Sequence, residues 1–261
     1  MGSHLGAIGL PTTENGFNES VTAIMSRAER LGATAEGRVE VYAYQDPSGS
    51  RATVTLEERR VACLTPTFAP ATALAVRIGS LADDACPYER PLMVELLDEG
   101  GEELLPLAVA IEDLGALDRV PEGEGRLEVV ALGEQITLYA DEAAYRSSGT
   151  PMAVASLIPS GLFAPGVVQP DRGEPSQVAP RILMSGTVEA AELRRHSIFD
   201  LPFVVCRVAS YGAEWTACLD PADLGGAADP RVPEVGSIIS GQFYVSGRLL
   251  RNAPRVAPER S

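Results

Sequence analysis

Apolar residues near the N-terminus recur first at helical spacing and then at alternating spacing. Between Asn15 and Gly32 they stand three or four positions apart, which predicts one apolar face of a helix, formed by Phe17, Val21, Ile24, Ala28 and Leu31. Asn15 or Asn18 is expected to cap this helix, and Gly32 to end it. Alternation on both sides of the turn residues 46–49 then predicts a β-hairpin.

Two later stretches share the same landmarks in the same order. Each opens with a proline before a β-rich run, at Pro91 and Pro202, and reaches a second proline 30 or 31 residues later, at Pro121 and Pro233. A glycine ten residues after the opening proline and an Asp-Leu pair 22 or 21 residues after it also recur. A series of this kind predicts an internal duplication.

Interior glycines indicate what each repeat forms. Gly241 and Gly247 interrupt the apolar run that ends the second repeat. Glycines inside a strand pattern mark bulges or sharp bends, which small barrels use to close. The expected fold is therefore mainly β, in the α+β class: an N-terminal helix and hairpin, then two duplicated small antiparallel barrels joined by a proline-rich linker.

Composition sets the expected divisions of the chain. Six prolines between residues 151 and 180 favour extended chain, and Leu157, Ile158, Leu162 and Phe163 are expected to pack against a barrel. The divisions are 1–4 (a tag remnant, MGSH), 5–70 (helix and hairpin), 71–145 (first barrel), 146–181 (linker), 182–250 (second barrel) and 251–261 (disordered tail).

Charge is distributed unevenly between the repeats. The chain of 261 residues carries a net charge of -15, and residues 75–140 contribute 4 - 15 = -11, whereas residues 182–250 contribute 5 - 8 = -3. This charge disfavours nucleic acid and anionic membranes as partners. No lysine is present, which excludes a P-loop and lysine nucleophiles. No signal peptide or membrane span is visible, so the cytoplasm is the expected location.

The second repeat holds the candidate contact residues. Basic and aromatic side chains gather there at Arg194, Arg195, His196, Phe199, Tyr211 and Trp215. They predict a non-catalytic protein that binds a protein partner through this repeat. One alternative is binding of single-stranded nucleic acid, with Phe203, Tyr211 and Trp215 on the stacking face of a barrel. Another is an enzyme with a site between the barrels, in which His196 works with Ser197 or Asp200.

The acidic pairs and the cysteines give no further expected site. The pairs Asp83-Asp84 and Glu102-Glu103 could bind a cation or act as paired carboxylates in a cleft between the barrels, but neighbouring carboxylates of a strand point to opposite faces, which favours surface charge.

Cys206 and Cys218 stand six residues on either side of Gly212, which allows a cross-strand disulfide, although two reduced core thiols are the expected state. Their spacing, with Cys63 and Cys86, fits no zinc motif. No metal and no cofactor are predicted.

One resemblance supports the barrel prediction. The pattern GTV, PFVVCRV and VPEVGSIISGQFYVSGRL of the second repeat is similar to the barrel domain of uncharacterised bacterial proteins with tandem barrels like the oligonucleotide-binding (OB) fold. The first repeat departs from it at its end, where ALGEQITLYA replaces GQFYVSGRLL. The resemblance implies a fold and no activity.

Overall fold

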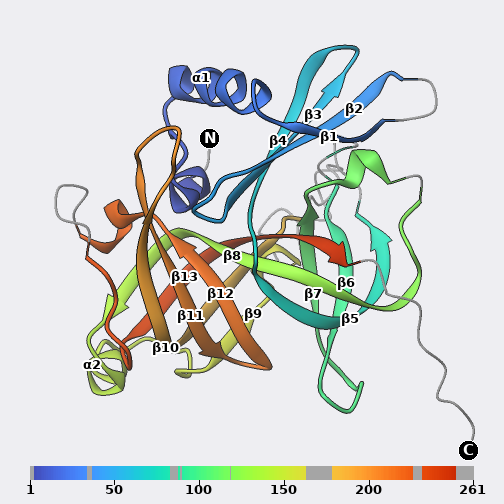
Figure 1. Cartoon of the computed structure of the whole chain (residues 1–261). Coiled ribbons are helices and arrows are strands. Elements are labelled where there is room, and N and C mark those ends of the chain that lie inside the picture. Colours follow the sequence, from blue (N-terminus) through green and yellow to red (C-terminus); the bar gives the residue numbers. More distant parts are fainter. Residues whose placement is uncertain are drawn as a thin grey trace, which may run out of the picture.

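The computed structural model describes residues 3–33, 37–82, 88, 90–117, 119–162, 178–225 and 231–250, and within these ranges the chain is mainly β (Figure 1). This confirms the mainly β fold class. The tail predicted over 251–261, Phe163, Cys86 and the pair Asp83-Asp84 lie outside the described residues.

The N-terminal helix is shorter than its apolar spacing predicts. α1 (Glu14–Met25) begins after Thr13, whose hydroxyl accepts a hydrogen bond from the Gly16 amide at 3.1 Å. The N-cap is therefore Thr13 and not Asn15 or Asn18, because a hydroxyl at this position satisfies an amide that has no partner within the helix.

A four-stranded antiparallel sheet follows the helix, in the order β1 (Glu29–Ala33), β2 (Val39–Gln45), β3 (Ser50–Glu57) and β4 (Arg60–Phe68). β2 and β3 form the predicted hairpin. The prediction that the helix reaches Gly32 is wrong, because residues 29–33 pair with β2 instead. Leu31 continued the helical spacing in the sequence, but its side chain is 43% exposed on the strand.

The other nine strands form one sheet that closes on itself twice. They are β5 (Thr72–Leu81), β6 (Leu92–Leu97), β7 (Glu103–Ile111), β8 (Gly123–Tyr139), β9 (Ser156–Ile158), β10 (Arg181–Arg195), β11 (Pro202–Ser210), β12 (Ala213–Leu219) and β13 (Ile238–Leu250). β5, β6 and β7 close through β13 and β8 into what we call the first ring; β10, β11 and β12 close through β8 and β13 into the second ring. In both rings the neighbours are antiparallel, except β7 with β13 and β12 with β8.

β8 and β13 are long enough to serve both rings. They pair antiparallel from Arg126 with Leu250 to Tyr139 with Ile238. The first half of β8 pairs with β5 of the first ring, and residues further along β8 pair with β12 of the second ring. In the same way, the first half of β13 pairs with β10 of the second ring, and its second half pairs with β7 of the first ring. Interior glycines allow the close approach, because a Cβ at Gly241 or Gly247 would overlap a carbonyl oxygen of β8.

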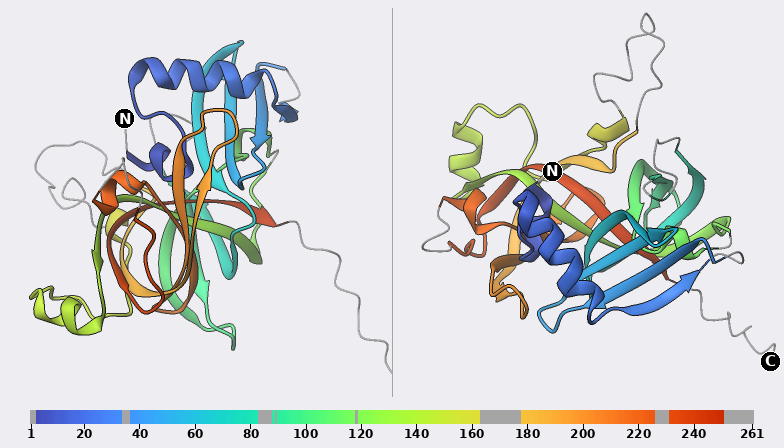
Figure 2. Two further views of the ribbon diagram at one scale, coloured as in Figure 1. Left: turned by 60° about the vertical axis from the view of Figure 1, so that its left-hand side comes forward. Right: turned by 90° about the horizontal axis from the view of Figure 1, so that it is seen from above.

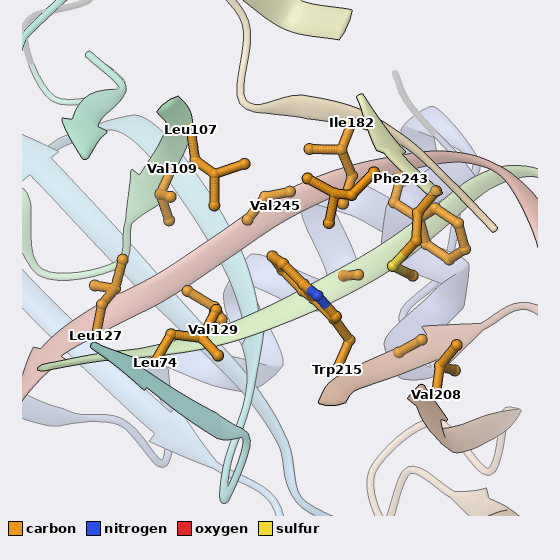
Figure 3. Packing of buried hydrophobic residues seen from close by; sticks show 14 of the residues in the cluster. Leu74, Leu107, Val109, Leu127, Val129, Ile182, Val208, Trp215, Phe243 and Val245 are labelled. Atoms are coloured by element: carbon orange, nitrogen blue, oxygen red, sulfur yellow. The ribbon is translucent and has the colours of Figure 1, made fainter. Parts of the chain in front are cut away.

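One continuous apolar core fills both rings. Buried side chains of the first ring, such as Leu107 and Leu127, join those of the second ring, such as Trp215 and Phe243, in a single cluster (Figure 3). Shared strands cannot separate without exposing this cluster to water, so the two rings are expected to unfold together.

The N-terminal segment covers the outside of the second ring. η1 (Ser3–Ile8) places Ile8 in a second apolar cluster with Phe203 and Cys218, and all three side chains are fully buried. His4, which the sequence assigns to a tag remnant, stacks on Tyr244 with 4.4 Å between ring centroids. Figure 2 shows α1 and the four-stranded sheet on one side of the two rings.

A buried ion pair fastens the four-stranded sheet to the first ring. The Nε atom of Arg51 on β3 lies 2.8 and 2.9 Å from the two carboxylate oxygens of Glu112, which follows β7. The Thr67 hydroxyl donates to the same carboxylate at 2.6 Å. Because Glu112 is only 3% exposed, removing one partner would leave an uncompensated buried charge.

The segment predicted as an extended linker contains regular structure. Within 146–181, β9 adds a short strand to the edge of β10. α2 (Glu142–Ser147), which follows β8 directly, extends only its last two residues into this segment. Leu157 is buried as predicted, whereas Ile158 is 41% exposed because neighbouring residues of a strand point to opposite faces. The last described turn of this segment is η3 (Ser160–Leu162), in which Leu162 is half-buried.

Candidate functional site

The end of β10 and the loop that follows it, which together carry four of the six predicted contact residues, are docked on the N-terminal sheet. The anchor is Asp46 in the β2–β3 turn, which is 1% exposed. Its carboxylate accepts hydrogen bonds from the amides of Ser48 and Ser197 at 2.9 and 3.1 Å, and from the hydroxyls of Tyr44, Ser48 and Ser197. Burial alone raises the pKa of Asp46, but the hydrogen bonds from Ser197 and Ser48 outweigh burial and lower it to about 2.

His196 lies beneath this anchor as a neutral side chain. The ring is 1% exposed, and its Nδ1 atom accepts a hydrogen bond from the Ile198 amide at 3.2 Å, which leaves the ring proton on Nε2. Burial lowers the pKa of His196, and the Asp46 charge, with Oδ2 3.6 Å from Nδ1, only partly offsets this. The ring of Phe199 packs against it, with 4.9 Å between centroids.

The catalytic pairs considered for His196 are not formed. The Ser197 hydroxyl donates to Asp46 rather than to the imidazole. The side chain of Asp200 is 88% exposed and lies 3.4 Å from Arg195. The histidine therefore contributes to the docking of the loop and holds neither of its sequence neighbours in a proton-transfer geometry.

The two arginines that end β10 have partners within the chain. Arg194 donates from Nη1 to the Ser48 carbonyl oxygen at 2.7 Å, and its guanidinium lies 5.3 Å from the centroid of the Phe68 ring. Arg195 donates to the carbonyl oxygen of Asp200 at 2.7 Å and keeps 54% of its side chain exposed. Only the second arginine therefore presents its charge mainly to solvent.

The proposed stacking face of the second ring is absent. Phe203 packs under the N-terminal segment and Trp215 packs inside the ring, so the two side chains lie on opposite sides of the sheet. Trp215 is 0% exposed, and a partner cannot reach it while the ring stays closed (Figure 3). Tyr211, at the β11–β12 turn, is 46% exposed.

Cys206 and Cys218 are free buried thiols on opposite faces of the sheet. Cys206 pairs with Ala217 and Cys218 with Val205, so the two positions are one residue out of register. A one-residue offset turns side chains to opposite faces, which excludes a disulfide between them without a change of register. Burial raises the pKa of Cys206 to about 12.

A cleft at the open end of the first ring was not anticipated from the sequence. It has a volume of about 650 Å³ and is lined by the end of β13, the turn before β8 and the residues after β7; these include Ile78, Asp113, Leu117, Arg119, Glu122, Glu124, Arg126, Leu249 and Leu250. We call it the first-ring cleft. Its size is typical of a ligand pocket, and its lining combines charged and apolar side chains. The sequence contains the repeated pairs Asp113-Leu114 and Asp223-Leu224, but it does not indicate that the first of them borders a cleft.

The other end of the β8–β13 pair carries an aromatic contact with α2. Antiparallel pairing of β8 with β13 brings Tyr139 beside Ile238 at one end of the pair and Leu250 beside Arg126 at the other. At the first of these ends α2 places Tyr145 against Tyr139, with 5.0 Å between ring centroids and 89° between ring planes. Tyr145 is 1% exposed.

A smaller hollow of about 410 Å³ lies between the second ring and Phe68. Its arginines are already paired: Arg194 with Glu192, and Arg207 with Glu189 and Glu214 at 3.5 and 3.3 Å. An anion would have to compete with these carboxylates for the guanidinium groups.

No protein-family model matches the chain, and no curated protein or solved structure matches it either. Within the ranges that the structure describes, none of the helices has the length and apolar character needed to cross a bilayer.

Proposed function

We propose that this chain is a non-catalytic binding protein, built from two duplicated OB-like barrels, and that a protein partner occupies the first-ring cleft. One observation carries the proposal: described residues of β5, β8 and β13 line a cleft of about 650 Å³ at one end of the β8–β13 pair. Accessible pockets with an apolar floor and a few polar groups are the usual places for a ligand or partner.

The strand order supports the duplicated OB-like barrels. Each ring has five strands, one parallel pair closes each ring, and a short 3-10 helix separates the third strand from the fourth in both. These helices are η2 (Leu114–Ala116) and η4 (Pro221–Leu224), which follow the repeated Asp-Leu positions. Closed five-stranded barrels of this kind are typical of OB-like folds.

Most of the predicted contact residues of the second repeat are engaged within the chain, so we propose an interface in the first repeat instead. Arg194, His196 and Phe199 hold the N-terminal sheet, and Trp215 lies in the core. A protein partner is also favoured over nucleic acid, because residues 75–140 carry a net charge of 4 - 15 = -11. Arg195 and Tyr211 remain accessible, and the experiment below tests them separately.

The test is affinity purification from the native cell with variants of each surface. Leu250→Glu places a charge on the partly exposed floor of the first-ring cleft and is expected to abolish recovery of the partner. Val235→Glu is the matched control, because this side chain precedes β13, is 73% exposed and does not line the cleft. Equal recovery with both variants, or loss only with Arg195→Glu or Tyr211→Ala, would refute the location in the first ring.

A further inference from the structure

Each ring is completed by a strand that belongs to the other half of the chain. Residues 72–139, which we call the β5–β8 segment, and residues 181–250, the β10–β13 segment, supply four of these strands each. The first ring also needs the second half of β13, which pairs with β7, and the second ring needs the later part of β8, which pairs with β12. Figure 1 shows β8 and β13 running side by side across both rings. Neither segment closes a ring with its own strands alone.

The contact between the two segments is extensive and does not depend on how they are connected. All 13 residues of β13 have a pairing partner on β8. Buried side chains of both segments, such as Leu127 and Phe243, share one apolar cluster. A second copy of the chain carries the same residues, so its β10–β13 segment can form the same ladder and the same cluster. Exchange of identical elements between copies is a low-cost route to a dimer for this reason.

The connection between the segments decides which copy is used. It comprises residues 140–180, and its described part contacts both segments. Tyr145 packs on Tyr139 of β8, and β9 pairs with residues 183–185 of β10. Tethering of this kind usually sets the effective concentration of two modules on the order of 1 mM. A second copy competes with the chain's own segment when its concentration approaches that value.

Two further sites combine residues of both segments. The first-ring cleft takes Asp113 from the β5–β8 segment and Leu250 from the β10–β13 segment. The N-terminal sheet binds the first segment through Arg51 and Glu112, and the second through Asp46 and the Ser197 amide. In an exchanged dimer the cleft would be present twice, each time built from two chains.

We infer that this chain forms a strand-exchanged dimer with a second copy of itself, in which each ring joins the β5–β8 segment of one chain to the β10–β13 segment of the other. The inference goes beyond the proposed function, because it requires no partner in the first-ring cleft. The dimer contains the same strand pairs and the same apolar cluster as the single chain.

The test is joint refolding of two variants with one added cysteine each, Thr137→Cys and Ser240→Cys. These positions are pairing partners on β8 and β13, so their side chains lie on the same face. The variants are unfolded in urea, refolded together at about 1 mM, near the expected effective concentration, and oxidised with glutathione disulfide. We expect a heterodimer linked between positions 137 and 240. Its ratio to monomer should fall about tenfold when the refolding concentration is lowered about tenfold.

Two controls accompany this test. A chain with both added cysteines should form the disulfide within the monomer, which shows that the two positions are close enough to oxidise. Tyr211→Cys in place of Ser240→Cys should give no link to position 137, because this residue lies in the turn between β11 and β12 and outside the β8–β13 ladder.

Two outcomes would overturn the inference. One is monomer alone at the high refolding concentration. The other is a dimer without the link between positions 137 and 240, which would place the contact on another surface. If the variants do not refold from urea, coexpression of the two chains in one cell replaces that step, and the same two outcomes decide.

Discussion

The two ends of the shared β8–β13 pair have the same strand geometry and opposite surroundings. At one end Tyr145 is buried against Tyr139, and at the other Leu250 borders a cleft of about 650 Å³. At the first end, the contact comes from α2, which follows β8 at once. The same pair of shared strands thus has an aromatic contact at one end and borders a cleft at the other.

The largest expected effect concerns the core that both rings share. Trp215→Ala removes a fully buried indole and should lower the free energy of unfolding by about 4 kcal/mol. Urea denaturation followed by circular dichroism measures this. Tyr211→Ala, at an exposed turn of the same ring, is the control and should change the free energy by less than about 1 kcal/mol. Similar losses for both variants would contradict the assignment of Trp215 to the core.

The two ends of the shared strands should respond unequally to truncation. Tyr145→Ala removes a buried ring that packs on Tyr139 and should cost about 3 kcal/mol, whereas Leu250→Ala at the cleft should cost less than about 1 kcal/mol. Tyr145→Phe keeps the ring and loses only the hydrogen bond to Met152, for about 1 kcal/mol. If urea denaturation shows the same loss in free energy of unfolding for both alanine variants, the two ends of the β8–β13 pair do not differ in packing.

The anchor of the N-terminal sheet gives the next effect. Asp46→Asn replaces an acceptor-only group by one that also donates, so some amide and hydroxyl donors around it lose their partner. We expect a loss of about 2 kcal/mol in the free energy of unfolding. Hydrogen exchange should rise in the β2–β3 turn and the β10–β11 loop together. A rise in only one of them would show that Asp46 does not couple the two elements.

The smallest effect is a pH dependence from His196. Its pKa in the folded chain lies below the ordinary value of 6.5 because of burial, so below that pH the unfolded chain binds more protons. Stability is therefore full above about pH 6.5 and falls on acidification, by at most about 1.4 kcal/mol per pH unit. His196→Gln should flatten this part of the profile. Identical profiles for the variant and the parent chain between pH 7 and 5 would contradict the assignment.

The sequence was informative where local chemistry decides the structure. Alternation around the 46–49 turn predicted the β2–β3 hairpin. The glycines at 241 and 247 mark the places where the backbone of β13 lies closest to that of β8. Helical spacing misled at Leu31, because pairing of residues 29–33 with β2 outweighed the pattern. The use of β8 and β13 by both rings depends on long-range pairing and left no local signal.

The residues of the candidate site were even harder to predict from local sequence than the strand pairing. Arg194, His196 and Trp215 stood out because basic and aromatic residues are typical of interfaces. In the folded chain Arg194 and His196 contact the N-terminal sheet, and Trp215 packs in the core. The first-ring cleft is lined by ordinary residues, Leu249 and Leu250 among them, which only the fold brings together with Asp113 and Glu122.

Site-specific photo-crosslinking in the native cell shows which surface contacts a partner. A benzophenone amino acid is placed at Leu250 in the first-ring cleft, at Val235 before β13, and at Tyr211 in the second repeat. We expect a crosslinked protein partner from position 250 and none from the other two positions. Crosslinks from position 211 or 235 with none from position 250 would contradict it and return the interface to the second repeat.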